Sequence, residues 1–229
     1  MSLEAAIRAT EILLAIALLQ QTLEHLSGLR DDRALYLTRL VLSVLLLIGI
    51  QTQWVSMGLF LIGGLILKRF QGPYNGGSDL MGLLVLFCLC LVHLAPSAQL
   101  QEYVFAYLAL QLVLSYFKSG LVKIWNPDWR AGTALQDVFR FSIYPVSESL
   151  RSWAAWPRLL CAMSWAVMVF ELAFPLTLIS KPALIAGLGL ALAFHVANAC
   201  LFGFNRFLWV WPAAYPSILW LQHRAFMVG

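Results

Sequence analysis

The chain has 229 residues, of which 61% are hydrophobic and only 11% are charged, and its mean hydropathy is +0.80. A soluble domain carries roughly 25% charged residues, so this excess of apolar side chains excludes an ordinary soluble protein and indicates an integral membrane protein. The net charge is only +4 and no basic tail or arginine-rich run accompanies it, which argues against a nucleic-acid partner and favours the lipid bilayer.

Apolar runs recur along the whole chain. A helix that crosses a bilayer needs about 20 mostly apolar residues, and candidate runs lie at residues 5–23, 35–50, 54–67, 79–96, 103–124, 159–179, 183–203 and 206–221. No strand-like alternation persists between them. We therefore predict an all-α, polytopic helical bundle of about seven to nine membrane-embedded helices, multi-pass in the cell membrane, with residues 1–229 forming one domain.

One long connection, residues 125–158, separates the fifth and sixth candidate spans. Within it, "GTALQDVFRFSIY" (132–144) has the pattern of an amphipathic helix on a membrane surface. If the chain crosses the bilayer eight times, most lysines and arginines fall on one side, which makes that side cytoplasmic by their excess.

A lysine stands in the last turn of the fifth apolar run. In "SGLVKIWNPDW" (119–129), Lys123 is followed by Trp125, Asp128 and Trp129. A lysine at the edge of a low-dielectric pocket gives up its proton more readily, so Lys123 is a candidate base. The alternatives are that Lys123 reaches the headgroups, that Asp128 caps a helix and that the tryptophans anchor the interface.

Three other polar stretches accompany it. "FQGPYNGGSD" (70–79) contains Asn75, Ser78 and Asp79, and "FHVANACLFGFNR" (194–206) places His195 and Asn198 on one helix side. Glu171 lies inside the sixth span, where a carboxylate is costly unless it faces a pocket or a partner. His195 could equally be a packing residue, and Glu171 could pair structurally with a lysine or arginine. We expect these stretches to meet at one membrane interface.

Metal and thiol chemistry find no support in the sequence. The four histidines are scattered without the spacing of metal ligands, so no metal is predicted. The four cysteines include no Cys-x-x-Cys pair and suit packing in the bundle.

These segments resemble those of a known family. "YFKSGLVKIWNPDWRAG" (116–132) resembles the signature of the vitamin K-dependent gamma-carboxylase-like proteins, the horizontally transferred transmembrane (HTTM) domain family, in which a Tyr-Phe-x-x-Gly helix ends in a lysine before Asp-Trp and Gly. "YNGGSDLMGLL" (74–84), "FEL" (170–172) and "FHVANACLFGFN" (194–205) resemble further family motifs in the same order.

The resemblance implies a chemistry. In the carboxylase, the lysine that matches Lys123 is the base that deprotonates vitamin K hydroquinone. By resemblance, Lys123, His195 and Glu171 are candidate catalytic residues, and the candidate substrate- or cofactor-binding residues are Asn75, Ser78, Asp79, Trp125, Asp128, Trp129 and Asn198. The cofactor would be a quinone-like or vitamin K-like hydroquinone, and a peptide or protein could be the substrate. The family's histidine in its Asn-Asn-His-Ser motif aligns with Gly77 here, and the carboxylase's orientation opposes the one that the basic residues indicate.

Two functions follow from these observations. The first is a membrane-embedded enzyme that abstracts a proton from a lipid-soluble cofactor, in the manner of a carboxylase or epoxidase. The second is a non-enzymatic membrane helper, such as an immunity or export partner of a peptide system. An enzyme should have Lys123, Asp128, Glu171 and His195 lining one cavity of ligand size, whereas a helper could have them dispersed or paired off.

Overall fold

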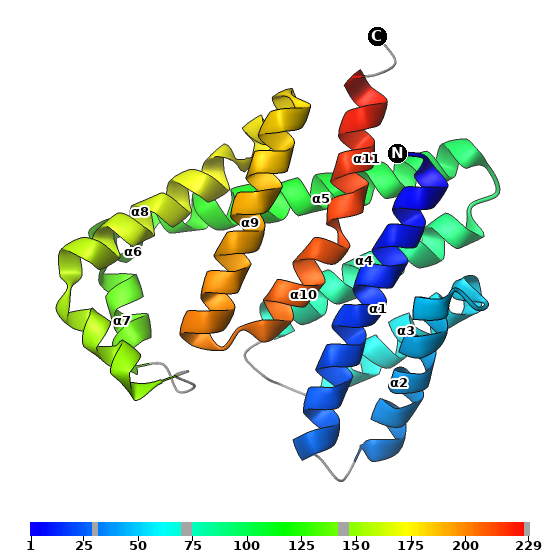
Figure 1. Ribbon diagram of the computed structural model, residues 1–229, viewed down its shortest axis with the longest axis horizontal. Coiled ribbons are helices and arrows are strands. Elements are labelled where there is room, and N and C mark those ends of the chain that lie inside the picture. Colours follow the sequence, from blue (N-terminus) through cyan, green and yellow to red (C-terminus); the bar gives the residue numbers. More distant parts are fainter. Residues whose placement is uncertain (29–31, 70–74, 142–146, 227–229) are drawn as a thin grey trace. The chain divides into compact units, whose positions relative to one another are not determined.

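The computed structural model describes residues 1–28, 32–69, 75–141 and 147–226, and within these ranges the chain is helical and contains no strand. Figure 1 shows the helices, which in chain order are α1 (Leu3–Gly28), α2 (Arg33–Ile48), α3 (Thr52–Arg69), the π-helical turn η1 (Asn75–Asp79), α4 (Leu80–Leu94), α5 (Ala98–Trp125), α6 (Pro127–Ala131), α7 (Thr133–Phe141), the 3-10 helix η2 (Glu148–Ala155), α8 (Pro157–Ala173), the 3-10 helix η3 (Phe174–Ile179), α9 (Lys181–Phe202), α10 (Asn205–Ala213) and α11 (Tyr215–Phe226).

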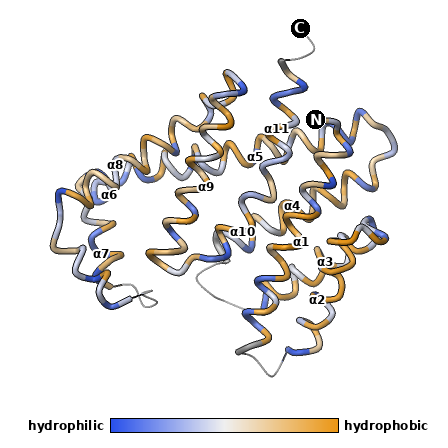
Figure 2. The backbone as a smooth tube through the Cα atoms, viewed as in Figure 1, coloured by the Kyte–Doolittle hydropathy of each residue, from blue (hydrophilic) through white to orange (hydrophobic). Residues whose placement is uncertain are grey.

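Four helical segments are long and apolar enough to cross a membrane. They are Gly77–Leu94, Ala98–Trp125, Pro157–Ile179 and Lys181–Phe202, and hydrophobic residues dominate them along their lengths (Figure 2). The prediction of an all-α protein is confirmed for the described residues, and these four segments are candidates to cross a membrane. These four segments leave the larger number of seven to nine embedded helices as a prediction.

The helix ends follow local chemistry in the sequence. Asn126 accepts a hydrogen bond on its side chain from the Asp128 N–H and caps α6, which begins at Pro127, because proline suits the first turn of a helix. The last predicted span, residues 206–221, is divided into α10 and α11. Pro212 lies inside α10 and Pro216 follows the first residue of α11, and proline withholds the N–H that a continuous helix needs.

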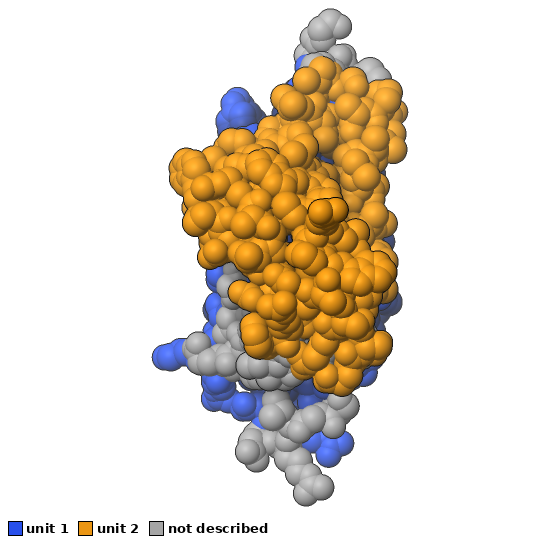
Figure 3. Space-filling model, turned by 90° about the vertical axis from the view of Figure 1, so that its left-hand side faces the viewer, with its two compact units in different colours: residues 1–110, 206–229 blue, residues 111–205 orange. Residues whose placement is uncertain are grey.

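The chain divides into two compact units, coloured separately in Figure 3. Unit 1 contains residues 1–110 and 206–229, and unit 2 contains residues 111–205, so that α5 contributes to both. In unit 1, α1 packs against α2, α4 and α11, and α3 packs against α4. In unit 2, α6 and α7 pack against α8, and η3 packs against α9.

An ionic cluster joins three helices of unit 1. The Glu11 carboxylate in α1 accepts hydrogen bonds from His93 Nε2 in α4 at 2.7 Å and from Arg8 Nη1 at 2.8 Å. Arg8 also donates to the Leu46 carbonyl oxygen at 2.8 Å, one of the last carbonyls of α2, which have no partner within their own helix. Glu11 thereby links the ends of α1, α2 and α4.

The amphipathic segment of unit 2 turns its apolar side toward protein. Leu135 and Phe139 of α7 are buried in one cluster with Ala154, Leu160 and Phe202. The sequence pattern was expected to place this side on the membrane surface, but η2, α8 and α9 cover it. Residues 142–144 of the predicted helix lie outside the described residues.

Candidate functional site

A close contact between α5 and α8 sets the geometry around Lys123. Gly120 of α5 lies so near α8 that a Cβ atom there would be 2.9 Å from both Glu171 Cβ and the backbone nitrogen of Leu172. Only a residue without a side chain allows this approach. Because Lys123 follows Gly120 by one helical turn, its side chain reaches the Glu171 carboxylate.

Lys123 and Glu171 form a buried ion pair. Lys123 Nζ lies 2.7 Å from Glu171 Oε1 and 2.6 Å from Oε2, and it donates a third hydrogen bond to Ser119 Oγ at 2.6 Å. The two charged side chains are only 16% and 3% exposed. All three ammonium donors therefore have acceptors, as a buried cation requires. The alternative in which Lys123 merely reaches the headgroups does not describe this geometry.

The turn after Lys123 is fixed against α8. Ser164 Oγ donates to the Trp129 carbonyl oxygen at 2.5 Å, and Trp165 Nε1 donates to the Arg130 carbonyl oxygen at 3.0 Å. These bonds hold the Trp129 ring with its centre 5.3 Å from Lys123 Nζ, within the range of a cation–π interaction. Trp129 is thus part of the Lys123 environment.

Two other predicted residues of this turn point elsewhere. Trp125 is 71% exposed, in keeping with the anchor interpretation. Asp128 is exposed, lies in the first turn of α6 and accepts a hydrogen bond on Oδ1 from the Thr133 hydroxyl at 3.3 Å. Asn126, two residues before Asp128, is the residue that caps α6, so the capping function expected of Asp128 belongs to Asn126.

A second buried pair lies one to two turns earlier on α5. The Tyr116 hydroxyl and His195 Nε2 of α9 share a hydrogen bond at 2.8 Å, and both residues are buried. Tyr116 also contacts the rings of Phe170 and Phe174. Asn198, three residues after His195 on α9, is partly buried, and its carbonyl oxygen accepts hydrogen bonds that end the helix at Gly203 and Phe204.

An open apolar groove of about 500 Å³ borders this aromatic cluster in unit 2. It runs along α8, η3 and α9, and its lining includes Phe170, Phe174, Thr177, Gly187 and Phe194. Phe170 and Phe174 separate it from Tyr116. Lys123, Glu171 and His195 are not among its lining residues. Its walls are almost entirely apolar side chains, so the groove presents a hydrocarbon surface.

The "NGGSD" segment belongs to the other unit. Ser78 is fully buried, and the Asp79 carboxylate lies 3.6 Å from Arg206 Nη1; the side chain of Asn75 lies outside the described residues. Ser78 and Asp79 are therefore in unit 1, whereas Lys123, Glu171 and His195 are in unit 2. The expectation that all these segments share one site stays a prediction.

Gly77 has no room for a side chain. A Cβ atom at this position would lie 2.5 Å and 2.6 Å from two carbon atoms of the Phe207 ring, which stacks on Trp211. The position at which the resembling family carries a histidine is thus taken by an aromatic ring from α10.

Sequence reasoning missed several residues that complete the site. Tyr116, Ser119, Gly120 and Lys123 recur at spacings of three and four, which places them on one face of α5, and this periodicity was a usable signal. Ser164, which holds the Trp129 backbone, gave no signal of its own. Among the described residues no group of three or more His, Cys, Asp or Glu side chains could hold a metal ion.

Comparison with known proteins identifies a family for the chain. The model of one family, the HTTM domain, matches residues 33–221, a range that contains the Lys123–Glu171 pair, the Tyr116–His195 pair and the "NGGSD" turn. No curated protein and no solved structure matches the chain. The match covers most of the sequence, and the chain belongs to the HTTM domain family.

Proposed function

We propose that this membrane protein binds a lipid-soluble ring compound of the quinone class and that Lys123, with Glu171, takes a proton from its hydroquinone form. The observation that carries the proposal is the ion pair in which Lys123 Nζ contacts both carboxylate oxygens of Glu171. An ionisable pair within membrane-crossing helices is costly to keep, which favours a use in proton transfer over a purely structural one.

The pair offers Lys123 a way to act as a base. Transfer of one ammonium proton along the hydrogen bond to Glu171 converts two buried charges into two neutral groups, and low-dielectric surroundings favour the neutral forms. Neutral Lys123 can then accept the proton of a nearby hydroxyl, whose bonding electrons stay on the oxygen. Trp129, with its ring centre 5.3 Å from Nζ, stabilises the ammonium that forms by about 1 kcal/mol.

The apolar groove of unit 2 fits the ligand class. Its aromatic and aliphatic lining suits a hydrocarbon ring or an isoprenoid chain that enters from the bilayer. Phe170 and Phe174 lie between the groove and Tyr116, which is bonded to His195. A rotation of these two rings would bring a ligand to the Tyr116–His195 pair, and the ligand would then have to extend along the same face of α5 by two helical turns to meet Lys123.

The finer membrane topology is part of the same proposal. Beyond the four segments that are long and apolar enough to cross, α1, α2, α3 and the α10–α11 pair would also be embedded, which gives about seven to nine embedded helices in the cell membrane. The charged side chains that α1 carries would then be offset by polar contacts within unit 1, such as Glu11 with Arg8 and His93.

The test uses the full chain purified with its bound lipids. Mass spectrometry should detect a co-purifying quinone. Added under anaerobic conditions, a soluble naphthohydroquinone should show the absorption change that accompanies loss of a hydroxyl proton. Lys123→Arg should abolish this change, because arginine does not release its proton at accessible pH. Lys118→Arg is the matched control, since Lys118 is exposed on the same helix. An unchanged signal in Lys123→Arg would eliminate the base.

A non-enzymatic helper is the second candidate, and three observations favour it. Lys123, Glu171 and His195 do not line the groove and Asp128 is exposed, so these residues do not surround one cavity as an enzyme should have them. All three ammonium donors of Lys123 already have acceptors in Ser119 and Glu171, and the Phe207 ring fills the place of a side chain at Gly77. A helper of a peptide system would carry no quinone through purification. Its function in the host would survive Lys123→Met combined with Glu171→Gln, a variant that an enzyme of the proposed kind would not tolerate.

A further inference from the structure

Ser119 contacts both members of the Lys123–Glu171 ion pair. Its hydroxyl oxygen accepts a hydrogen bond from Lys123 Nζ at 2.6 Å and donates one to Glu171 Oε1 at 3.1 Å. Ser119 and Lys123 are four residues apart on α5, so their side chains lie on one face of that helix, whereas Glu171 comes from α8. The hydroxyl therefore closes a ring of hydrogen bonds between two helices.

A serine within a helix often bonds to its own backbone. Ser115, one turn before Ser119 on α5, does so, because its hydroxyl donates to the Leu112 carbonyl oxygen at 2.7 Å. In the part of the chain that the structure describes, Ser119 donates to no carbonyl of its own helix and crosses instead to Glu171. The direction of this hydroxyl is thus set by the ion pair.

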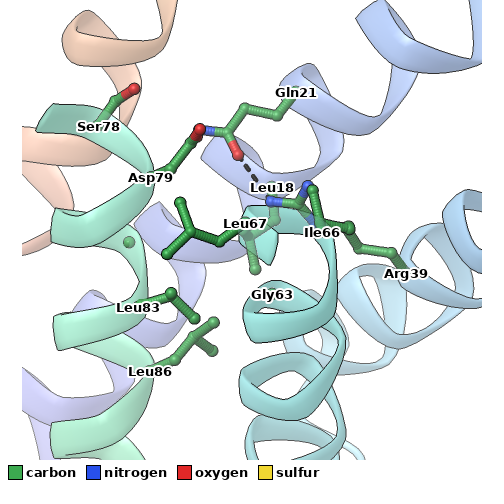
Figure 4. A pocket seen from close by; sticks show the side chains of 11 residues that line it. Leu18, Gln21, Arg39, Gly63, Ile66, Leu67, Ser78, Asp79, Leu83 and Leu86 are labelled. Atoms are coloured by element: carbon green, nitrogen blue, oxygen red, sulfur yellow. Dashed lines mark hydrogen bonds between the residues drawn. The ribbon is translucent and has the colours of Figure 1, made fainter. Parts of the chain in front are cut away.

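Burial beside a cation does not by itself produce such a bridge. In unit 1, Arg39 and Ser78 border one small cavity. Arg39 donates to Gln21 Oε1 at 2.7 Å, and Figure 4 shows the Ser78 hydroxyl directed away from Arg39. Ser119 differs because it accepts from a buried cation and donates to the counter-ion of that cation.

Ser119 can keep both hydrogen bonds when the ion pair becomes neutral. When one proton passes from Lys123 Nζ to the carboxylate, the electrons of the N–H bond stay on the nitrogen and the attraction between charges is lost. A hydroxyl has one donor and two acceptor sites, so Ser119 still accepts from an amine N–H and still donates to Oε1. Hydrogen bonds then hold the two groups together where charge no longer does.

Ser119 also distinguishes the two oxygens of Glu171. Oε1 accepts from Lys123 at 2.7 Å and from Ser119 at 3.1 Å, whereas Oε2 accepts from Lys123 at 2.6 Å. A protonated carboxyl group keeps two free lone pairs on its carbonyl oxygen. Both hydrogen bonds at Oε1 are therefore preserved when the transferred proton forms its new bond to Oε2.

We propose that Ser119 is a positioning residue of this site, which directs the Lys123 proton to Glu171 Oε2 and holds the amine beside the carboxyl group once both are neutral. The inference rests on the proposed function, because it concerns proton transfer within the ion pair. Ser119 is not among the lining residues of the apolar groove, so it acts through Lys123 and Glu171 and not through binding of the ligand.

The test measures the initial rate of naphthohydroquinone deprotonation by the purified full chain at increasing ligand concentration. Ser119→Ala should lower the maximal rate by about tenfold and leave the half-saturating concentration unchanged. Ser119→Thr keeps a hydroxyl and should restore most of the rate. Ser115→Ala is the matched control, because the Ser115 hydroxyl bonds to the backbone of α5, and it should keep the wild-type rate. An unchanged rate in Ser119→Ala, or a loss that Ser119→Thr does not restore, would overturn the positioning role.

A second measurement needs no ligand. Reductive methylation followed by mass spectrometry reports how freely each lysine amine reacts. Without the Ser119 hydroxyl, Lys123 should be methylated faster relative to Lys118, which is exposed on the same helix and serves as the internal reference. A wild-type protein that deprotonates no hydroquinone would overturn the proposed function and the proton route with it. An active wild type, with the same rate and the same ratio of Lys123 to Lys118 methylation in Ser119→Ala, would overturn the inference about Ser119 alone.

Discussion

Lys123 Nζ and the Glu171 carboxylate meet across α5 and α8 at 2.6–2.7 Å, immediately beside the contact of Gly120 with Glu171 Cβ and the Leu172 backbone. Gly120 and the Lys123–Glu171 ion pair depend on each other. The close approach of the two helices places the carboxylate within reach, and the ion pair in turn holds the helices together. Four predictions follow from this contact and from comparable ones in unit 1.

Glu171→Gln should destabilise the protein by about 3 kcal/mol, because it leaves the buried Lys123 ammonium without its counter-charge. Thermal unfolding in detergent measures the loss. Lys123→Met combined with Glu171→Gln removes both charges and should recover much of the lost stability, since no unpaired charge is then left buried. A double variant less stable than Glu171→Gln would show that the charges are not coupled.

Gly120→Ala should cost about 1–3 kcal/mol, the usual range for overpacking, because the new methyl group meets backbone as well as a side chain. It should also separate Lys123 from Glu171 and reduce any proton transfer. Gly189→Ala is the control, since nothing lies within 4 Å of a Cβ atom there. That change should be neutral or stabilising by up to about 1 kcal/mol through helix propensity. Equal effects of the two substitutions would contradict the close-packing account.

The positions of the helices could be predicted well from the sequence, and their packing could not. Long apolar runs predict where helices lie, because hydropathy is a local property, but the cap of α6 was expected at Asp128 and is Asn126. Which helices contact each other is not a local property. The sequence left two interpretations of Glu171 open, a catalytic group or a structural partner of some cation. Only the fold identifies Lys123 as that cation. Arg39 lay inside an apolar run with no visible partner, and Gln21, its acceptor, is 18 residues away.

Gly77→Ala should destabilise by about 1–3 kcal/mol in the wild-type background, because the Phe207 ring occupies the space of the methyl group. In a Phe207→Ala background the same substitution should cost almost nothing, so a double-mutant cycle should show strong coupling. Gly82→Ala is the control: its methyl group would meet Val210 of the same helix as Phe207 at an ordinary 3.9 Å. Additive effects of Gly77→Ala and Phe207→Ala would refute the steric explanation.

The stability of unit 1 should depend on pH through His25, which lies in the last turn of α1, outside the four candidate membrane segments. Burial first, and then Arg206 and Arg39, lower the pKa of His25 below its value of about 6.5 in an unfolded chain. Above that pH the residue is neutral in both states and contributes no pH dependence. As the pH falls below about 6.5 the unfolded chain takes up the proton first, so the free energy of unfolding decreases until the folded state is protonated too. Melting temperatures measured from pH 8 to pH 5 should show this decline, and His25→Gln should flatten it, because glutamine does not titrate. A decline of the same steepness in His25→Gln would assign the pH dependence to another group.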